Sequence, residues 1–401
     1  MKRIPRLSCL KEYQELMKLY HEDRTHPEEG SLVAYVTSGA PVEILDAFGF
    51  ITVYPENYGA QCGVQKLSTG LCESAEAEGY AGDLCAYAKG HLASSLNPGT
   101  GIPDALPEPD FLLCCTNICG TVLPWYEHLA EIHKCPLFII DVPFIFSSDD
   151  VPGAVSYVAD QMKECIGVLE KLTGKKMDYA LLSGIIMRSK EAIRLWTEIR
   201  ECGKAVPSPV HVPDLFLTMA PIVVMRSSQG TIDFYRSMLK ELRDRIAGGV
   251  SAVGGEKFRL LWDNIAVWVD IFRFYRFFAE QGACFVGDTY TGSWSQELNA
   301  DNPVQGLAEA YTTPYINLNA DIRVGVIDSM RHDFSAQGII YHANRSCKPF
   351  SLTQRIIRKQ IMETDFIPSL ELDTDMCDER LYSRASIQER CLAFMELLSQ
   401  Q

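Results

Sequence analysis

The stretch Asp110-Phe-Leu-Leu-Cys-Cys-Thr-Asn-Ile-Cys-Gly120 predicts a strand, a polar turn and the start of a helix in immediate succession. The apolar run Phe111–Cys115 has the length and composition of a strand that is buried on both faces. The turn carries Cys119, and a helix is expected to open at Thr121. A thiol in such a turn lies at the carboxyl edge of a sheet, where α/β folds bind ligands, and the helix start favours its thiolate form.

The same succession of strand, turn and helix recurs along the chain. Strands are predicted at residues 31–36, 50–54, 137–141, 258–262, 283–286, 338–342 and 366–372. Pro41 opens the helix after the first strand. Residues 55–59 are expected as a polar turn after the second strand, and Asp83 as the N-cap of a helix that starts near Cys85. Cys347 lies in the turn between the strand at 338–342 and a helix from Ser351 onward. Strands joined through helices pair in parallel, so their carboxyl ends meet at one edge. Ser38 and Glu56 are therefore expected at the same edge as Cys119.

This alternation predicts an α/β protein with two Rossmann-like or flavodoxin-like lobes. Each lobe would hold a short parallel sheet, and the two sheets would face each other across a cleft. Three prolines within residues 207–213 mark the connection between the halves. The expected division is an N-terminal helical segment (1–30), a first α/β domain (31–150), a helical connector (151–213) and a second α/β domain (214–401).

The composition and charge of the chain limit which partners it can bind and where in the cell it is expected. The chain has 401 residues and a formal net charge of −15, which argues against nucleic acid and anionic membranes as partners. No apolar run reaches the length of a membrane span, and the N-terminus lacks the apolar segment of a signal peptide. A cytoplasmic location is therefore expected. The fourteen cysteines include no Cys-x-x-Cys pair, which argues against a zinc finger.

Three cysteines share one local setting. Cys85, Cys119 and Cys347 each follow a polar turn at the start of a predicted helix. If the two lobes face each other, their strand ends converge on one cleft, and thiolates from separate segments suit an iron–sulfur cluster better than a structural zinc site. The spacing alone leaves open that the three are unrelated buried thiols. Cys114 and Cys115, inside the predicted strand, are expected to be structural.

Four motifs carry a resemblance to a known family over most of the chain. They are Tyr54-Pro-Glu-Asn57, Asp83-Leu-Cys85-Ala-Tyr87, Cys114-Cys-Thr-Asn-Ile-Cys119 and Asn344-Arg-Ser-Cys347-Lys348. In this order they resemble the 2-hydroxyacyl-CoA dehydratase family, which includes the benzoyl-CoA reductase subunits. The similarity is greatest to the substrate-binding subunit of the dehydratases. Any one of these motifs is weak, and the ordered set is specific.

This resemblance implies a cofactor, a substrate and two protein partners. Cys85, Cys119 and Cys347 would hold a [4Fe-4S] cluster whose fourth position carries water or hydroxide until the 2-hydroxyacyl-CoA substrate displaces it. A second, related subunit would complete a heterodimer, and a separate ATP-hydrolysing iron–sulfur activator would supply one electron at low potential. That electron would turn the thioester carbonyl into a ketyl radical anion, which expels the neighbouring hydroxyl and makes the β-proton acidic. The open iron would act as a Lewis acid.

Ser38 and Glu56 match the positions that the family uses beside the substrate. Ser38 is expected to hydrogen-bond the thioester or hydroxyl oxygen, and Glu56 to assist proton transfer, with a raised pKa in a dry cleft. Without the resemblance, Ser38 could simply cap the helix that begins at Pro41, and Glu56 could be a solvated turn residue. Further interpretations cover five other residues: structural roles for Asn57 and Asn117, a core role for His342, and local charge or contact with CoA phosphates for Arg345 and Lys348.

Three functions remain open on these grounds. The first is a subunit of an oxygen-sensitive (R)-2-hydroxyacyl-CoA dehydratase, a hydro-lyase that forms 2-enoyl-CoA. The second is a benzoyl-CoA reductase subunit, in which the cluster would deliver electrons to an aromatic ring. The third is a non-catalytic iron–sulfur subunit that carries electrons to a partner. Ser38 together with Glu56 favours dehydration.

Overall fold

The computed structural model describes residues 6–25, 27–103, 106–365 and 367–400. Its strands form two four-stranded sheets in which all neighbours run parallel. The first sheet comprises β1 (Val33–Val36), β2 (Ile51–Val53), β3 (Phe111–Cys115) and β4 (Leu137–Ile140). The second comprises β5 (Phe258–Asp263), β6 (Ala283–Asp288), β7 (Gly338–Asn344) and β8 (Ser369–Thr374). The α/β fold with two parallel-sheet lobes, predicted from the sequence, is confirmed.

The two sheets share one strand order. The first is arranged β2-β1-β3-β4 and the second β6-β5-β7-β8. In each sheet the chain steps to one side of its first strand and then returns to the other side, so the order reverses between β1 and β3 and again between β5 and β7. Open α/β sheets bind ligands beyond the carboxyl ends of the strands at such a reversal. The loops after these four strands are therefore the first place to look for a site.

The central strands are apolar because helices cover both of their faces. Every residue of β3 is fully buried, including Cys114 and Cys115, and the residues of β1, the other central strand of that sheet, are buried throughout. A strand covered on both faces has no solvated side and needs no alternating pattern. The sulfur atoms of Cys114 and Cys115 thus belong to the core, as expected from their place in the strand.

Helices connect and cover the sheets. In the first lobe these are α1 (Leu10–Thr25), α2 (Val42–Phe48), α3 (Pro55–Val64), α4 (Ser68–Ala77), α5 (Ala86–Leu96) and α6 (Val122–His133). The middle of the chain forms α7 (Val151–Thr173), α8 (Tyr179–Glu201), α9 (Val212–Thr218), α10 (Ala220–Val224) and α11 (Gln229–Ala247). The second lobe adds α12 (Ile271–Glu280), α13 (Pro303–Thr312), α14 (Ala320–Asp333), α15 (Lys348–Asp365) and α16 (Arg384–Leu398).

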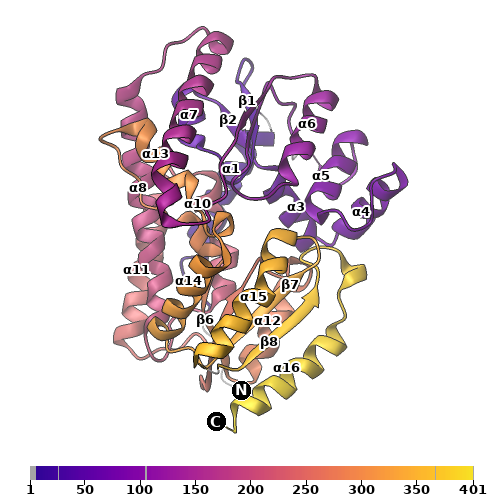
Figure 1. Cartoon of the computed structure of the whole chain (residues 1–401), viewed down its shortest axis with the longest axis vertical. Helices are drawn as coiled ribbons and strands as arrows, with labels where there is room; N and C mark the ends of the chain where they lie inside the picture. Colours follow the sequence, from indigo (N-terminus) through magenta and orange to yellow (C-terminus); the bar gives the residue numbers. More distant parts are fainter. Residues whose placement is uncertain (1–5, 26, 104–105, 366, 401) are drawn as a thin grey trace.

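The long middle helices form a layer along one flank of the molecule (Figure 1). Helix α8 packs against α11 and also against α2 of the first lobe, while α13, from late in the chain, packs against α7. The layer therefore contacts both lobes and fixes one side of the space between them. The domain boundaries at 150 and 213 stay predictions. Within the described ranges, no helix combines the length and the apolar character needed to cross a bilayer.

Local structure departs from the sequence-based expectations in three places. Residues 55–59, expected as a polar turn, form the first turn of α3, because Pro55 occupies the position where its missing N–H costs nothing. Asp83 does not cap α5 as expected, since Cys85 itself occupies the N-cap position. Helices α13 and α14 are not predicted by the sequence patterns. Phe366, the expected start of the last strand, and residues 1–5 and 26 of the N-terminal segment lie outside the described residues.

Candidate functional site

The five residues singled out from the sequence lie around one pocket. Ser38 follows β1, Glu56 stands in the first turn of α3, Cys85 caps α5, Cys119 follows β3 and Cys347 follows β7. All five line a single pocket. Four of them come from the first lobe, and Cys347 comes from the second. The two lobes therefore contribute to the same site, at the strand-order reversal of each sheet.

Backbone N–H groups at the starts of three different helices act to lower the pKa of the three thiols. They belong to Tyr87 and Ala88 for Cys85, to Thr121 and Val122 for Cys119, and to Phe350 for Cys347. Amides at a helix start point along the helix dipole and stabilise negative charge on the acceptor. This arrangement favours a thiolate, or a thiolate bound to metal, over a neutral thiol.

Burial acts in the opposite direction on the same thiols. It raises the pKa of Cys85 and of Cys119, and it raises the pKa of Cys347 to about 12. The nearby thiols add to the effect, since Cys119 and Cys347 both raise the pKa of Cys85. Three mutually repelling sulfur atoms in a dry pocket can all be anionic only with a compensating cation, and metal ions lower the pKa of a bound thiol.

The donor set fits an iron–sulfur cluster better than a single ion. The described part of the chain has no group of three or more His, Cys, Asp or Glu side chains placed to hold one metal ion. In a four-iron cluster each thiolate binds a different iron, so its ligands need not converge on one point. Cys85, Cys119 and Cys347 supply three thiols on one pocket wall. The donor set is thus compatible in chemistry with such a cluster, and the cluster itself stays a prediction.

Ser38 and Glu56 are joined to each other. Glu56 Oε1 accepts the backbone N–H of Ser38 at 3.1 Å and its hydroxyl at 3.4 Å. Burial raises the pKa of Glu56 to about 7, against the lowering effect of these hydrogen bonds. Its other oxygen, Oε2, is buried and has no hydrogen-bond partner among the described residues. A buried carboxyl oxygen of this kind is costly unless a ligand or a proton satisfies it.

The remaining pocket wall is mostly apolar and aromatic. Besides the residues already named, it includes Tyr87, Trp125, Ile193, Tyr290, Trp294, Leu298, Tyr311, Ile316 and Phe350. Sequence reasoning missed these residues. Tyr290 and Trp294 directly follow β6, so the rule that located Cys119 could have found them, whereas Ile193 and Tyr311 reach the pocket only because α8 and α13 pack there. Such a wall excludes water and strengthens every polar interaction inside.

The other residues weighed from the sequence have structural partners. The Asn117 amide donates to the carbonyls of Gly39 and Tyr311 at 2.9 and 2.7 Å, which ties the Cys119 turn to its neighbours. His342 is buried in the core, and its Nδ1 lies 2.7 Å from the carbonyl oxygen of Ile265. These findings agree with the structural roles expected for both residues.

The basic residues next to Cys347, Arg345 and Lys348, form hydrogen bonds with neighbouring parts of the second lobe. Arg345 makes two hydrogen bonds to the carboxylate of Asp373, at 2.7 and 2.8 Å. The ammonium group of Lys348 donates to the carbonyl of Arg345 at 2.7 Å. Neither Arg345 nor Lys348 lines the pocket that holds the thiols. Contact with CoA phosphates at these two residues stays a prediction.

Comparison with known proteins identifies the family of this chain. The family profile described as "2-hydroxyglutaryl-CoA dehydratase, D-component" matches residues 37–398. The chain belongs to the 2-hydroxyacyl-CoA dehydratase family. It is 34% identical to the (R)-2-hydroxyisocaproyl-CoA dehydratase alpha subunit of Clostridioides difficile, over 93% of this chain and 91% of that one. It is 31% identical to the lactoyl-CoA dehydratase subunit alpha of Anaerotignum propionicum, over 95% and 94% of the two chains.

The dehydratase family also extends to reductases. The chain is 25% identical to a benzoyl-CoA reductase subunit of Thauera aromatica, over 89% of this chain and 86% of that one. The family resemblance drawn from the four motifs is thus confirmed. Each of these relatives is named as one subunit of its enzyme.

Proposed function

We propose that this chain is the substrate-binding subunit of an oxygen-sensitive (R)-2-hydroxyacyl-CoA dehydratase. Family membership supports a role as a dehydratase component. The observation that carries the finer proposal is the convergence of Cys85, Cys119 and Cys347 with Ser38 and Glu56 on one apolar pocket. Three thiols and a buried carboxyl group with an unpartnered oxygen in the same pocket suit a site that combines a cluster with an acid–base group.

The proposed cofactor is a [4Fe-4S] cluster held by Cys85, Cys119 and Cys347. When bound, it would supply a Lewis-acidic iron for the oxygen atoms of the thioester. The amides at the starts of α5, α6 and α15 offset the negative charge on the three sulfur atoms. The apolar wall keeps water away from the site, which protects a reactive radical from side reactions.

The chain's own residues would position the substrate and move a proton. The hydroxyl of Ser38, 3.4 Å from Glu56 Oε1, can turn to donate to a substrate oxygen. Glu56 Oε2 is the acceptor, or the acid when protonated, for the proton that accompanies loss of water. A carboxyl group with a pKa of about 7 can hold or release a proton near neutral pH. Elimination through a ketyl radical anion of the thioester would make the β-proton acidic enough for such a group.

Two protein partners belong to the proposal. Each relative is named as one subunit of a larger enzyme, and the two dehydratase relatives as alpha subunits. These names support a heterodimer with a second, related subunit. A separate ATP-dependent iron–sulfur activator would supply the electron, since an electron at such low potential must be driven by an energy source. The chain is proposed to act in the cytoplasm, where low-potential clusters and CoA thioesters are handled.

The experiment that tests the proposal uses the heterodimer prepared without oxygen. The chain is produced with its neighbouring subunit and incubated with activator, ATP, reductant and (R)-2-hydroxyisocaproyl-CoA, and 2-enoyl-CoA is measured. Benzoyl-CoA is assayed in parallel, because one relative is a benzoyl-CoA reductase subunit. Formation of 2-enoyl-CoA that requires ATP and activator is expected. Reduction of benzoyl-CoA without any dehydration would instead identify a reductase subunit. A cluster whose spectrum does not change when either thioester is added would identify an electron-carrier subunit.

A further inference from the structure

The turns that carry Cys85 and Cys347 are hydrogen-bonded to each other across the two lobes. The N–H of Ala86, next to Cys85, donates to the hydroxyl oxygen of Ser346 at 2.9 Å. That hydroxyl in turn donates to Asp375 Oδ2 at 2.5 Å, and the N–H of Ser346 donates to the same oxygen at 3.0 Å. Ser346 and Asp375 are both buried. The residue beside one thiol is thus tied to the residue beside another.

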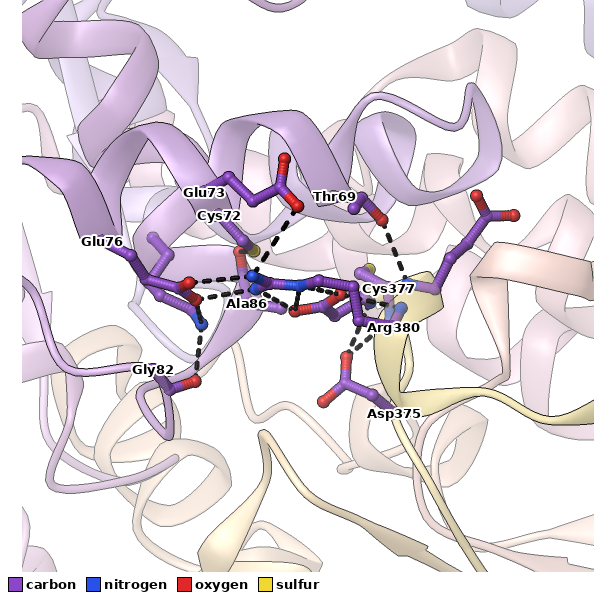
Figure 2. Close-up of polar contacts among 12 residues, drawn as sticks. Thr69, Cys72, Glu73, Glu76, Gly82, Ala86, Asp375, Cys377 and Arg380 are labelled. Carbon is purple, nitrogen blue, oxygen red and sulfur yellow. Dashed lines mark hydrogen bonds and ion pairs between the residues drawn. The ribbon is translucent and has the colours of Figure 1, made fainter.

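A second set of contacts holds the other end of the Cys85 turn. Arg380 donates to both carboxylate oxygens of Glu76 on α4, at 2.7 and 2.8 Å, and to Asp378 at 2.6 Å (Figure 2). Glu76 also accepts the ammonium group of Lys89 at 2.8 Å, and Lys89 donates to the carbonyl of Gly82 at 2.7 Å. Lys89 is almost fully buried. Hydrogen bonds from Arg380 and Lys89 lower the pKa of Glu76 to about 2.

One loop of the second lobe supplies both sets of contacts. Asp375 Oδ1 accepts the N–H groups of Cys377 and Asp378, each at 2.9 Å, so the loop 375–380 is internally braced. Asp375 of this loop binds Ser346, which accepts the N–H of Ala86. Arg380 of the loop binds Glu76, and Glu76 binds Lys89, which donates to the carbonyl of Gly82. The short turn 82–86 that carries Cys85 is therefore fastened to the second lobe at both of its ends. Figure 2 shows this loop meeting α4 with Arg380 and Glu76 facing each other.

We propose that this network, formed by Glu76, Lys89, Ser346, Asp375, Asp378 and Arg380, is a positioning device that fixes Cys85 relative to Cys347. The inference rests on the proposed function, because it assumes a cluster held by both lobes. A cluster is a rigid body, and thiolates from two lobes can hold it only while the lobes keep one separation. Lobes within a chain move relative to each other unless their contacts prevent it. Charge-assisted and fork-shaped Arg–carboxylate bonds are the strongest hydrogen bonds for that task.

The test measures retention of the cluster in the anaerobic heterodimer. Arg380→Met removes the contacts to Glu76 and Asp378. It is expected to speed cluster loss to an iron chelator about tenfold, because several charge-assisted bonds are lost. Arg384→Met is the matched control: Arg384 makes a similar pair of bonds to Asp270, at 2.8 and 3.0 Å, but within the second lobe. Cluster loss is followed by absorbance and by iron and sulfide content.

A second pair of variants separates positioning from general stability. Ser346→Ala is expected to speed cluster loss and broaden the EPR signal of the reduced cluster, whereas Ser346→Thr, which keeps the hydroxyl, should restore both. Equal rates for Arg380→Met, Arg384→Met and the unmodified chain would overturn the inference and leave the proposed function intact. An unmodified heterodimer that carries no cluster would overturn the proposed function and this inference with it.

A different part of the pocket carries a second inference. Arg226 lines the pocket and is 5% exposed, and its Nε lies 3.7 Å from Oε1 of Glu43, which is fully buried. The hydroxyl of Tyr311 donates to the other oxygen of Glu43 at 2.8 Å. Glu43 Oε1 has no hydrogen-bond partner among the described residues. The charge of Arg226 is therefore the main compensation for the buried charge of Glu43.

Tyr54 and the carboxyl group of Asp46 also lie near the guanidinium of Arg226, whereas the pocket wall that Arg226 shares is largely apolar. Ile193, Leu298 and Ala310 line the same pocket. If a substrate carboxylate formed an ion pair with the guanidinium of Arg226, the buried carboxylate of Glu43 would lose its ion pair. An unpaired buried charge costs free energy in a site without water. From this geometry we infer that the acyl side chain of the substrate is uncharged, aliphatic or aromatic, and that Glu43 sets this selectivity. The inference rests on the proposed function.

The test compares kcat/KM for (R)-2-hydroxyisocaproyl-CoA and (R)-2-hydroxyglutaryl-CoA. The unmodified enzyme is expected to prefer the first by about a hundredfold, the effect of one uncompensated buried charge. Glu43→Gln keeps the shape but removes one of the two carboxyl groups near Arg226, the other being that of Asp46, so the preference should fall about tenfold. Glu309→Gln, at an exposed position on α13, is the control. Equal rates on both thioesters, or no change in Glu43→Gln, would overturn this inference alone. Turnover of neither thioester would overturn the proposed function and this inference together.

Discussion

Replacement of Cys119 by alanine is expected to abolish binding of the iron–sulfur cluster and, with it, all dehydration. Cys119 supplies one of three thiols on the pocket wall, and its neighbours Thr121 and Val122 offer their amides to its sulfur. Two thiols cannot hold three corners of a four-iron cube. Iron and sulfide analysis of the anaerobically prepared heterodimer measures the loss, and the expected iron content attributable to this subunit is near zero.

The matched control is Cys135→Ala. Cys135 is also a free, half-buried thiol of the first lobe, but it does not line the pocket. Its replacement should leave iron content and turnover unchanged. Because the substitution removes only one sulfur atom from a loop, the free energy of unfolding of the apoprotein should change little in either variant. A Cys119→Ala subunit that kept its full iron content would remove Cys119 from the proposed ligand set.

Replacement of Glu56 by glutamine is expected to lower turnover by about 10²–10⁴-fold, the usual effect of losing a general acid–base group. Glutamine has the same shape and its side-chain oxygen can still accept the N–H of Ser38, the bond that is now 3.1 Å long. It cannot take up or release a proton at the position of Oε2, which is the atom without a partner in the described residues. The loss should appear in kcat rather than in KM.

Iron content separates this effect from damage to the cluster site. The Glu56→Gln variant should keep the iron and sulfide of the unmodified heterodimer, because no thiol is altered. Glu131→Gln, on the exposed face of α6, is the control and should behave like the unmodified chain. Full turnover in Glu56→Gln would show that another group moves the proton, and Glu56 would then have only a structural role beside Ser38.

The sequence predicts most of the fold because its signals are local. Continuous apolar runs such as Phe111–Cys115 specify strands covered on both faces, and polar turns before helices mark their carboxyl ends. Helix ends are less predictable. The sequence pattern places Pro55 in a turn, but it begins α3, and it favours Asp83 as a cap, a position that Cys85 occupies instead. The first error covers the five residues 55–59 and the second displaces a cap by two residues, both at a helix start, where several local conformations have similar energies.

Residues that reach the pocket from distant segments leave no such signal. Arg226 lies between α10 and α11, and Glu43 lies on α2, yet they form one buried pair. The contact between Ser346 and Ala86 joins positions 260 residues apart in the sequence. Periodicity describes which face of an element is buried, but not which other element covers it. These pairs are therefore visible only in the folded chain.

The sequence by itself determined the two parallel-sheet lobes and the family, and it selected Ser38, Glu56, Cys85, Cys119 and Cys347. Strand, turn and helix preferences act over a few residues, and ordered motifs can be compared without a structure. Only the tertiary structure decided that these five residues share one pocket, that its wall is apolar, and that a loop at 375–380 fastens the Cys85 turn to the opposite lobe. Such contacts depend on how two lobes pack, and packing is decided by shape and by the burial of surfaces that lie far apart along the chain.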